Sequence, residues 1–182
     1  VRKFLSQDGL SQIIVATSAE YVETARNILA GITPGETDLT VVEGGEERQH
    51  SIFNALKVAG DVDLVMVHDA VRPFVTPEQI QACRRVAEET GGAVLGIPAK
   101  DTINRFIRET PSRQFLWQTQ TPQVFKKELL MKAYRKAFGD GFVGTDDSSL
   151  VERLGVDVKM VEGDRTNFKI TYPPDLKLAK IL

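Results

Sequence analysis

Short apolar runs alternate with segments of helical period along most of the chain, and this alternation restricts the possible fold more than any other feature of the sequence. Repeated strand, helix, strand order is typical of α/β domains, in which helices pack on the faces of a sheet. Because the apolar runs contain few polar residues, we expect a mostly parallel sheet that helices cover on both faces. The predicted strands are residues 11–16, 39–42, 64–67 and 93–97.

The helical segments lie between these strands and continue after them. Thr76 followed by Pro77 is a typical helix start, with Thr76 as the N-cap and Pro77 at the first helical position. A short strand pair is expected at residues 158–161 and 168–171. The predicted helices are residues 19–29, 48–58, 77–89, 126–138, 146–154 and 174–182.

Length, charge and cysteine content exclude several classes of protein. With 182 residues the chain is expected to form one domain, residues 1–182, with a continuous core. The lone Cys83 excludes an internal disulfide and a multi-cysteine zinc site, and its helical surroundings favour a core position. A net charge of -2 and the lack of a long apolar segment argue against nucleic-acid and membrane partners. We therefore expect a cytoplasmic protein, or one of the plastid stroma if the source is a plant.

Ligands of open parallel sheets bind beyond the carboxyl ends of the strands, so residues that follow a strand are the first candidates for a site. Gly44 and Gly45 lie between a predicted strand and the helix that begins near Arg48. Such a turn offers free backbone N–H groups to a nucleotide, together with Ser51 one turn into the helix. Paired glycines also occur in ordinary turns, so the pattern alone leaves both interpretations open.

Asp69 and Arg72 follow the next predicted strand. A carboxylate there can hold Mg²⁺, and a guanidinium can bind phosphate oxygens. The alternative is that the two residues only pair with each other or cap the next helix. His68 is expected to be a packed, hydrogen-bonded residue, because no serine or cysteine nucleophile motif accompanies it. Asp61 belongs to an Asp-x-Asp motif that precedes the strand, at the wrong end for a ligand.

The segment after the fourth predicted strand has the pattern of a protruding two-stranded arm with a polar tip at residues 109–112. An arm too thin for a core of its own commonly packs on a second copy of the chain. Further along, Thr145 precedes a helix start, and Lys169 is expected on a short strand. Both also have simpler interpretations, as a helix-capping segment and a solvated charge.

Six motifs in order resemble the 2-C-methyl-D-erythritol 4-phosphate cytidylyltransferases: VVEGGEERQHS, VHDAVRPF, PAKDTI, LWQTQTPQVF, TDDSSLVE and NFKITYPPDLKLA. The resemblance spans nearly the whole chain. It implies a Rossmann-like α/β sheet, a homodimer joined through an arm at about residues 98–122, and a Mg²⁺-dependent transfer of CMP from CTP to a polyol phosphate.

The same resemblance assigns site residues by position. The nucleotide-binding set it implies is Gly45, Glu46, Arg48, Ser51 and Asp69, and Asp69 is also the metal-associated acid. The substrate-binding set is Arg72, Thr102, Arg113, Thr121, Thr145 and Lys169. Of these, Arg113 and Lys169 are the implied catalytic residues, which position the attacking phosphate. Glu46 stands where relatives often have Asp, and Val71 where Ala is frequent; neither difference is expected to abolish nucleotide binding.

The family pattern begins with a strand and a glycine-rich loop that carries an Arg and a Pro-Lys-Gln, and these 182 residues contain no such segment. We expect that this segment was omitted or cleaved, because loss of a central strand would expose sheet edges. Two alternative functions stay open. One is a ribitol-5-phosphate cytidylyltransferase, although Trp117 favours methylerythritol, and the other is a truncated, catalytically idle nucleotide-binding module.

Overall fold

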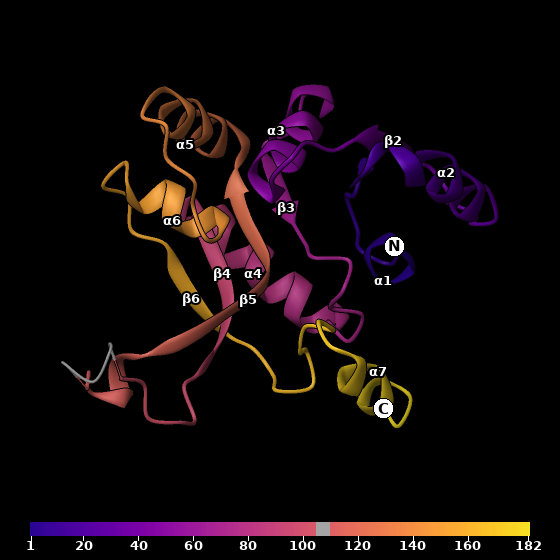
Figure 1. Ribbon diagram of the computed structural model, residues 1–182. Coiled ribbons are helices and arrows are strands. Elements are labelled where there is room, and N and C mark those ends of the chain that lie inside the picture. The colour runs from indigo at the N-terminus through magenta and orange to yellow at the C-terminus, as the bar shows by residue number, and fades with distance from the viewer. Residues whose placement is uncertain (105–109) are drawn as a thin grey trace.

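The computed structural model describes residues 1–104 and 110–182 and shows strands and helices in alternation (Figure 1). The first half contains α1 (Arg2–Leu5), β1 (Gln12–Thr17), η1 (Ala19–Tyr21), α2 (Val22–Ala30), β2 (Asp38–Glu43), α3 (Arg48–Val58), β3 (Leu64–Val67), α4 (Pro77–Thr90) and β4 (Gly92–Pro98). The second half contains η2 (Arg113–Phe115), β5 (Trp117–Lys126), α5 (Lys127–Gly139), α6 (Asp147–Glu152), β6 (Lys159–Glu162) and α7 (Pro173–Ala179). No helix within these described ranges is long and apolar enough to cross a membrane.

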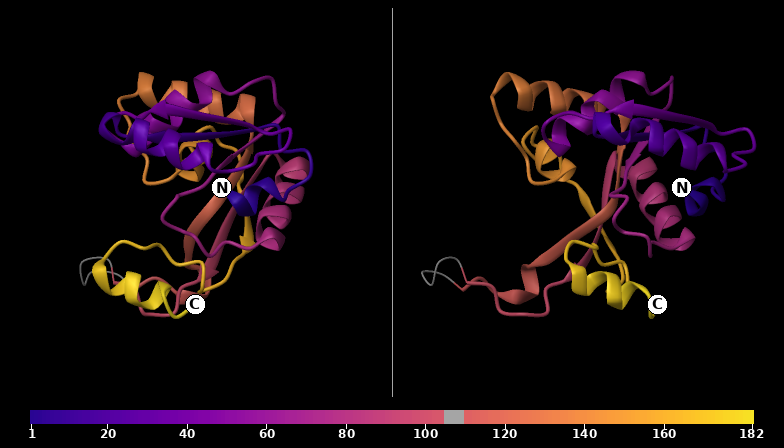
Figure 2. Two further views of the ribbon diagram at one scale, coloured as in Figure 1. Left: turned by 90° about the vertical axis from the view of Figure 1, so that its right-hand side faces the viewer. Right: turned by 45° about the vertical axis from the view of Figure 1, so that its right-hand side comes forward.

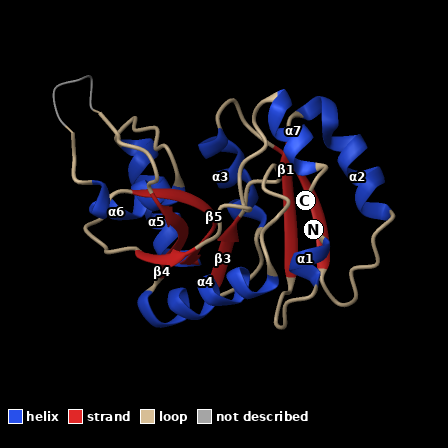
Figure 3. Ribbon diagram, turned by 90° about the horizontal axis from the view of Figure 1, so that it is seen from below, coloured by secondary structure: helices blue, strands red, loops and turns tan. Residues whose placement is uncertain are grey.

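The strands form two sheets among the described residues (Figure 3). β1 and β2 pair in parallel, and a four-stranded sheet has the order β3-β5-β4-β6. Only β5 is reversed in that sheet: it is antiparallel to β3 and to β4, while β4 and β6 are parallel. β3, β4 and β6 therefore run in one direction, and the predicted α/β class with a mostly parallel sheet is confirmed.

The core lies on both faces of the four-stranded sheet, as the apolar strands predict. On one face, Phe125 and Val94 pack with residues of α3, α5 and α6. On the other face, Val124 packs with Ala93, Leu95 and two residues of α4, one of which is Cys83. Burial raises the pKa of the Cys83 thiol to about 12, so this cysteine is an inert core residue, as predicted.

Most predicted elements lie where the sequence placed them, and α3 and β3 have the predicted bounds. Thr76 caps α4 through a capping box with Gln79. The predicted strand at residues 168–171 is wrong, because this segment makes no ladder; its one backbone link to the body is the Ile170 N–H to the Val71 carbonyl, 2.9 Å. The helix predicted to reach residue 154 ends at Glu152, where the chain turns toward Gly155 at φ +75°.

The protruding arm is two-stranded only at its base. The ladder between β4 and β5 ends at the pair Pro98 and Trp117, followed by one more backbone hydrogen bond from the Ala99 N–H to the Leu116 carbonyl, 2.9 Å. Beyond it, residues 100–104 and 110–112 form no strand, and the chain passes through η2. The segment projects away from the body (Figure 2), where no core holds two strands together. The predicted tip lies partly outside the described residues, since residues 105–109 are not among them.

Candidate active site

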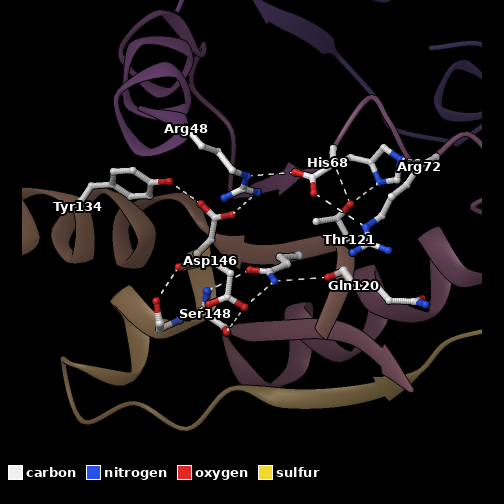
Figure 4. Close-up of polar contacts among 12 residues, drawn as sticks. Arg48, His68, Arg72, Gln120, Thr121, Tyr134, Asp146 and Ser148 are labelled. Atoms are coloured by element: carbon white, nitrogen blue, oxygen red, sulfur yellow. Dashed lines mark hydrogen bonds and ion pairs between the residues drawn. The ribbon is translucent and has the colours of Figure 1, made fainter. Parts of the chain in front are cut away.

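Asp69 directly follows β3, and its carboxylate lies among three cationic side chains. Arg48 Nε is 3.0 Å from Oδ1, while Lys169 Nζ is 3.3 Å and Arg72 Nε is 3.9 Å from Oδ2. Sequence alone left open a simple pair of Asp69 with Arg72. That pair exists, but it belongs to a larger cluster that joins α3, the end of β3 and the segment after β6. Figure 4 shows Arg48 and Arg72 of this cluster.

The charges of this cluster keep Asp69 ionised. Burial by itself would raise the pKa of this carboxyl, but the charges of Arg48 and Lys169, together with their hydrogen bonds, bring it below its ordinary value. The three cations outnumber the one carboxylate they share. A phosphate group brought to this edge of the sheet therefore meets an excess of positive charge in a partly desolvated site.

Thr121 holds the backbone of Asp69, and His68 holds that of Arg72. The Asp69 N–H donates to Thr121 Oγ1, 3.0 Å, and His68 Nε2 donates to the Arg72 carbonyl, 3.0 Å. Because that nitrogen carries the proton of the neutral ring, His68 Nδ1 accepts from the Thr121 hydroxyl, 3.1 Å. Burial lowers the pKa of His68, which agrees with a neutral ring. The prediction of a packed, hydrogen-bonded His68 is confirmed.

Asn167 fixes the segment that carries Lys169. Its side-chain amide donates to Gln120 Oε1, 3.1 Å, and to the Thr121 carbonyl, 3.0 Å. Its own carbonyl accepts from Arg72 Nη1, 2.9 Å. Asn167 and Gln120 are almost wholly buried, so a side-chain network, and not the predicted strand, brings Lys169 to Asp69. Sequence reasoning assigned neither residue a role, although both lie inside the motifs that carry the resemblance.

The paired-glycine turn lies between β2 and α3, as predicted, but its glycine N–H groups are bonded within the protein and are not free. The Gly44 N–H donates to the Thr17 carbonyl, 2.7 Å. The Gly45 N–H donates to Ser51 Oγ, 3.0 Å, and the Ser51 hydroxyl donates to the Glu47 carbonyl, 3.2 Å. A Cβ at Gly45 would lie 2.4 Å from His50 Cβ, so the turn packs too closely on α3 for any side chain there. Glu46 is exposed, and Arg48, on the first turn of α3, links this turn to Asp69.

We expect Gly45→Val to raise the KM for CTP sharply, because the added side chain forces the turn away from His50 and changes the direction of its N–H groups. Steady-state kinetics with varied CTP measures this effect. Gly60→Val is the matched control, since a Cβ at Gly60 has no heavy atom within 4 Å. Unchanged CTP binding in a folded Gly45→Val protein would remove the turn from the nucleotide site.

The remaining predicted residues lie elsewhere in the chain. Thr102 is exposed on the arm, and Arg113 lies in η2, where its Nη1 donates to the Lys100 carbonyl, 2.7 Å. The arm extends away from the body (Figure 1), so the chain does not bring these two residues to its own Asp69. Thr145 is exposed directly before Asp146, the N-cap of α6.

A buried carboxylate that sequence reasoning missed lies on the other side of Arg48. Asp147 is 0% exposed, and its Oδ2 is 2.9 Å from Arg48 Nη2. The Tyr134 hydroxyl donates to Oδ1 of the same carboxylate. Burial raises the pKa of Asp147, and the charge of Arg48 opposes that rise. The sequence showed two acidic residues at a helix start, a pattern typical of solvated capping groups, and gave no sign of this burial.

The described side chains could hold Mg²⁺ only if the phosphates of a nucleotide supplied further ligands. No group of three His, Cys, Asp or Glu that could hold a metal ion occurs in the part of the chain that the structure describes. Mg²⁺ in nucleotide enzymes usually keeps several waters and binds one or two carboxylates plus substrate phosphates. Asp69 provides one ionised carboxylate at the edge of the sheet where the carboxyl ends of the strands lie, so phosphate oxygens would have to complete the ligand set.

Two hollows lie on the surface of the described residues. One of about 290 Å³ borders the site and is lined by His68 and Arg72 together with residues of α1. The other, of about 650 Å³, lies between α2 and β2 and includes Arg26 and Asp38 in its lining. The larger hollow has none of the predicted site residues in its described lining. The volume of a hollow therefore does not by itself identify the site in this protein.

A glycine turn after β2 and a cluster of cations around Asp69 after β3 are the arrangement expected of a nucleotidyltransferase, and the family comparison places this α/β domain in that class. The family model described as 2-C-methyl-D-erythritol 4-phosphate cytidylyltransferase matches residues 1–182. The chain belongs to this family, and the resemblance carried by the six motifs is confirmed.

Similar proteins agree in sequence and in fold. The 2-C-methyl-D-erythritol 4-phosphate cytidylyltransferase of Caldanaerobacter subterraneus is 44% identical over 187 aligned positions, which cover 100% of this chain and 82% of that protein. The protein of the same name from Bacillus velezensis is also 44% identical, with 80% of its length covered. The crystal structure of that enzyme from Thermus thermophilus has a TM-score of 0.81 at 32% identity, covering 99% of this chain and 84% of the other.

Proposed function

We propose that this chain carries out the CTP-dependent cytidylyl transfer for which its family is named, and that the Asp69 cluster is the site. The reaction joins CMP to 2-C-methyl-D-erythritol 4-phosphate, gives 4-diphosphocytidyl-2-C-methyl-D-erythritol and releases pyrophosphate. The observation that carries the assignment is the ionised Asp69 among Arg48, Arg72 and Lys169 at the carboxyl end of β3. Two phosphate-bearing substrates repel each other, and this excess of cations offsets that repulsion.

The chemistry needs positioning more than it needs a proton acceptor. A phosphate oxygen of the substrate attacks the α-phosphorus of CTP in line, the new P–O bond forms, and the bond to the leaving pyrophosphate breaks. The attacking phosphate is already ionised, so no general base is required. This agrees with a neutral His68 whose two nitrogens are both engaged within the protein. Lys169 and Arg72 stabilise the charge that develops on the transferred group.

Asp69 is the residue we assign to Mg²⁺, because its carboxylate stays ionised and lies at the edge where phosphates arrive. The ion supplies further neutralisation of the triphosphate and the leaving group. Gly45, Glu46, Arg48 and Ser51 are assigned to the nucleotide, and support for this comes from the position of the turn directly before α3 and from Arg48, which links the turn to Asp69. Thr121 and Thr145 are assigned to the substrate side of the body.

The arm completes the proposal. We assign Thr102 and Arg113 to the active site of a second copy of the chain, because the arm carries them away from their own Asp69. This predicts a homodimer joined through residues 98–122 in which each protomer is one nucleotidyltransferase domain, residues 1–182. A cytoplasmic location is part of the same proposal.

An assay with two alcohol substrates tests the function. The full-length protein, including the glycine-rich loop and the Pro-Lys-Gln segment of the family pattern, is incubated with CTP, Mg²⁺ and either 2-C-methyl-D-erythritol 4-phosphate or ribitol 5-phosphate, and phosphorus NMR follows the products. We expect pyrophosphate and a cytidyl diphosphate ester with the methylerythritol compound. Faster turnover of ribitol 5-phosphate would favour the alternative enzyme, and CTP binding without any pyrophosphate would favour an idle nucleotide-binding module.

A further inference from the structure

Arg48 is held from both sides by carboxylates of different elements. Its Nε is 3.0 Å from Asp69 Oδ1 and its Nη2 is 2.9 Å from Asp147 Oδ2. The Arg48 side chain is 36% exposed, whereas that of Asp147 is 0% exposed. Figure 4 shows Arg48 between the strand end that carries His68 and the helix that carries Tyr134. One edge of the guanidinium thus reaches the site, and the other is anchored in the interior.

Asp147 and Tyr134, the buried side chains on the inner side of Arg48, are held in place by further contacts. Asp147 is the first residue of α6, whose N-cap Asp146 accepts from the Ser149 N–H at 3.0 Å and from Gln123 Nε2 at 3.0 Å. Tyr134 is 1% exposed, and its ring stacks on Phe53 of α3 with centroids 5.9 Å apart. The helix that carries Arg48 therefore packs directly on the tyrosine that binds Asp147. These contacts fix the distance between the buried carboxylate and the base of α3.

We propose that Asp147 and Tyr134 are positioning residues that act through Arg48, holding its guanidinium between the nucleotide turn and Asp69. The inference rests on the proposed function in one respect, that Arg48 binds the nucleotide. A buried carboxylate–guanidinium pair stabilises a protein no more than well-packed apolar side chains of similar size, so stability alone gives no reason for the pair here. The need to hold the long Arg48 side chain in one direction does give a reason for a buried Asp147. Asp147 does this without contacting the substrate.

Kinetics of Asp147→Asn and Tyr134→Phe form the first test. We expect kcat/KM for CTP to fall about tenfold in Asp147→Asn, because the ion pair that orients the Arg48 guanidinium is lost, and by less in Tyr134→Phe. The loss should come from KM for CTP, with KM for the alcohol substrate unchanged. Asp140→Asn is the matched control, because Asp140 also pairs with an arginine, Arg153 at 3.0 Å, but in an exposed position. Its kinetics should stay at the wild-type values.

A double variant separates positioning from a general loss of structure. If Asp147 acts through Arg48, Asp147→Asn should add nothing to the kinetic defect of Arg48→Met, since the group it positions is already gone. Multiplying defects in the double variant would show that Asp147 acts independently of Arg48. That result would overturn the proposal.

The NMR signal of the Arg48 Nε–H group gives a readout that does not depend on turnover. The signal is assigned by its loss in Arg48→Met, and in the wild type it should exchange slowly with water because the guanidinium is held at both edges. We expect faster exchange in Asp147→Asn and in Tyr134→Phe, and no change in Asp140→Asn. Tyr134→Phe, which removes a single oxygen, carries the test if Asp147→Asn does not fold.

The kinetic and NMR measurements together distinguish a failure of the proposed function from a failure of the positioning proposal. A wild-type protein that shows the restrained Arg48 signal but no cytidylyl transfer contradicts the proposed function and leaves the positioning intact. An Arg48 signal that is unchanged in folded Asp147→Asn and Tyr134→Phe proteins contradicts the positioning, whatever the activity is.

Discussion

Asp69→Asn in a full-length chain is expected to lower kcat/KM by about two to three orders of magnitude, the size of effect seen when one preorganised electrostatic contact of a transition state is removed. The carboxylate is the common partner of Arg48, Arg72 and Lys169, and it is the proposed ligand of Mg²⁺. Asparagine keeps the shape but loses the charge, so the cations repel each other and the ion is held weakly. Steady-state kinetics over a range of Mg²⁺ concentrations measures both effects.

Asp61→Asn is the matched control for this change. Asp61 is exposed and lies before β3, at the opposite end of the strand from Asp69, so its replacement should leave turnover unchanged. Asp61→Asn should melt as the wild type does. Asp69→Asn should melt at a lower temperature, because its cations lose their shared partner, but it should stay folded, because the two apolar faces of the sheet hold the domain together. An Asp69→Asn protein with native melting and full activity at low Mg²⁺ would show that Asp69 is not the metal-associated acid.

Full-length Arg113→Ala and Lys169→Ala proteins are each expected to be nearly inactive alone and to complement each other when mixed. Lys169 lies in the Asp69 cluster, whereas Arg113 lies in η2 on the arm. In a dimer with shared sites, a mixed pair has one site with both defects and one with neither. About a quarter of normal activity should therefore return when subunits pair at random, since half of the dimers are mixed.

Subunit exchange has to be verified in this experiment, for example by native mass spectrometry of differently tagged chains. Mixed dimers of Arg113→Ala with Arg113→Ala carrying a second tag are the control, because no site in them regains the arginine. If exchange is complete and both variants are folded and dimeric, yet no activity returns, Arg113 serves its own subunit and the sites are not shared.

The sequence by itself determined the local elements and the family. Apolar runs and helical periods depend on neighbouring residues, so β3, α3 and the Thr76 cap of α4 lie where the patterns predict. The rule that ligands bind at the carboxyl ends of strands selected Asp69 over Asp61, and the turn at Gly45 has the expected strand before it and helix after it. The order of the six motifs was sufficient for the family.

Only the tertiary structure decided how these parts meet. Lys169 reaches Asp69 through the buried side chains of Asn167 and Gln120, and not through the strand that local periodicity predicted. Asp147 looked like a solvated residue at a helix start, and it is instead 0% exposed and paired with Arg48. Burial of a charge depends on which distant segments pack around it, and no local pattern of residues contains that information. The long-range packing of α3, α5 and α6 therefore decided which charged groups lie together at the site.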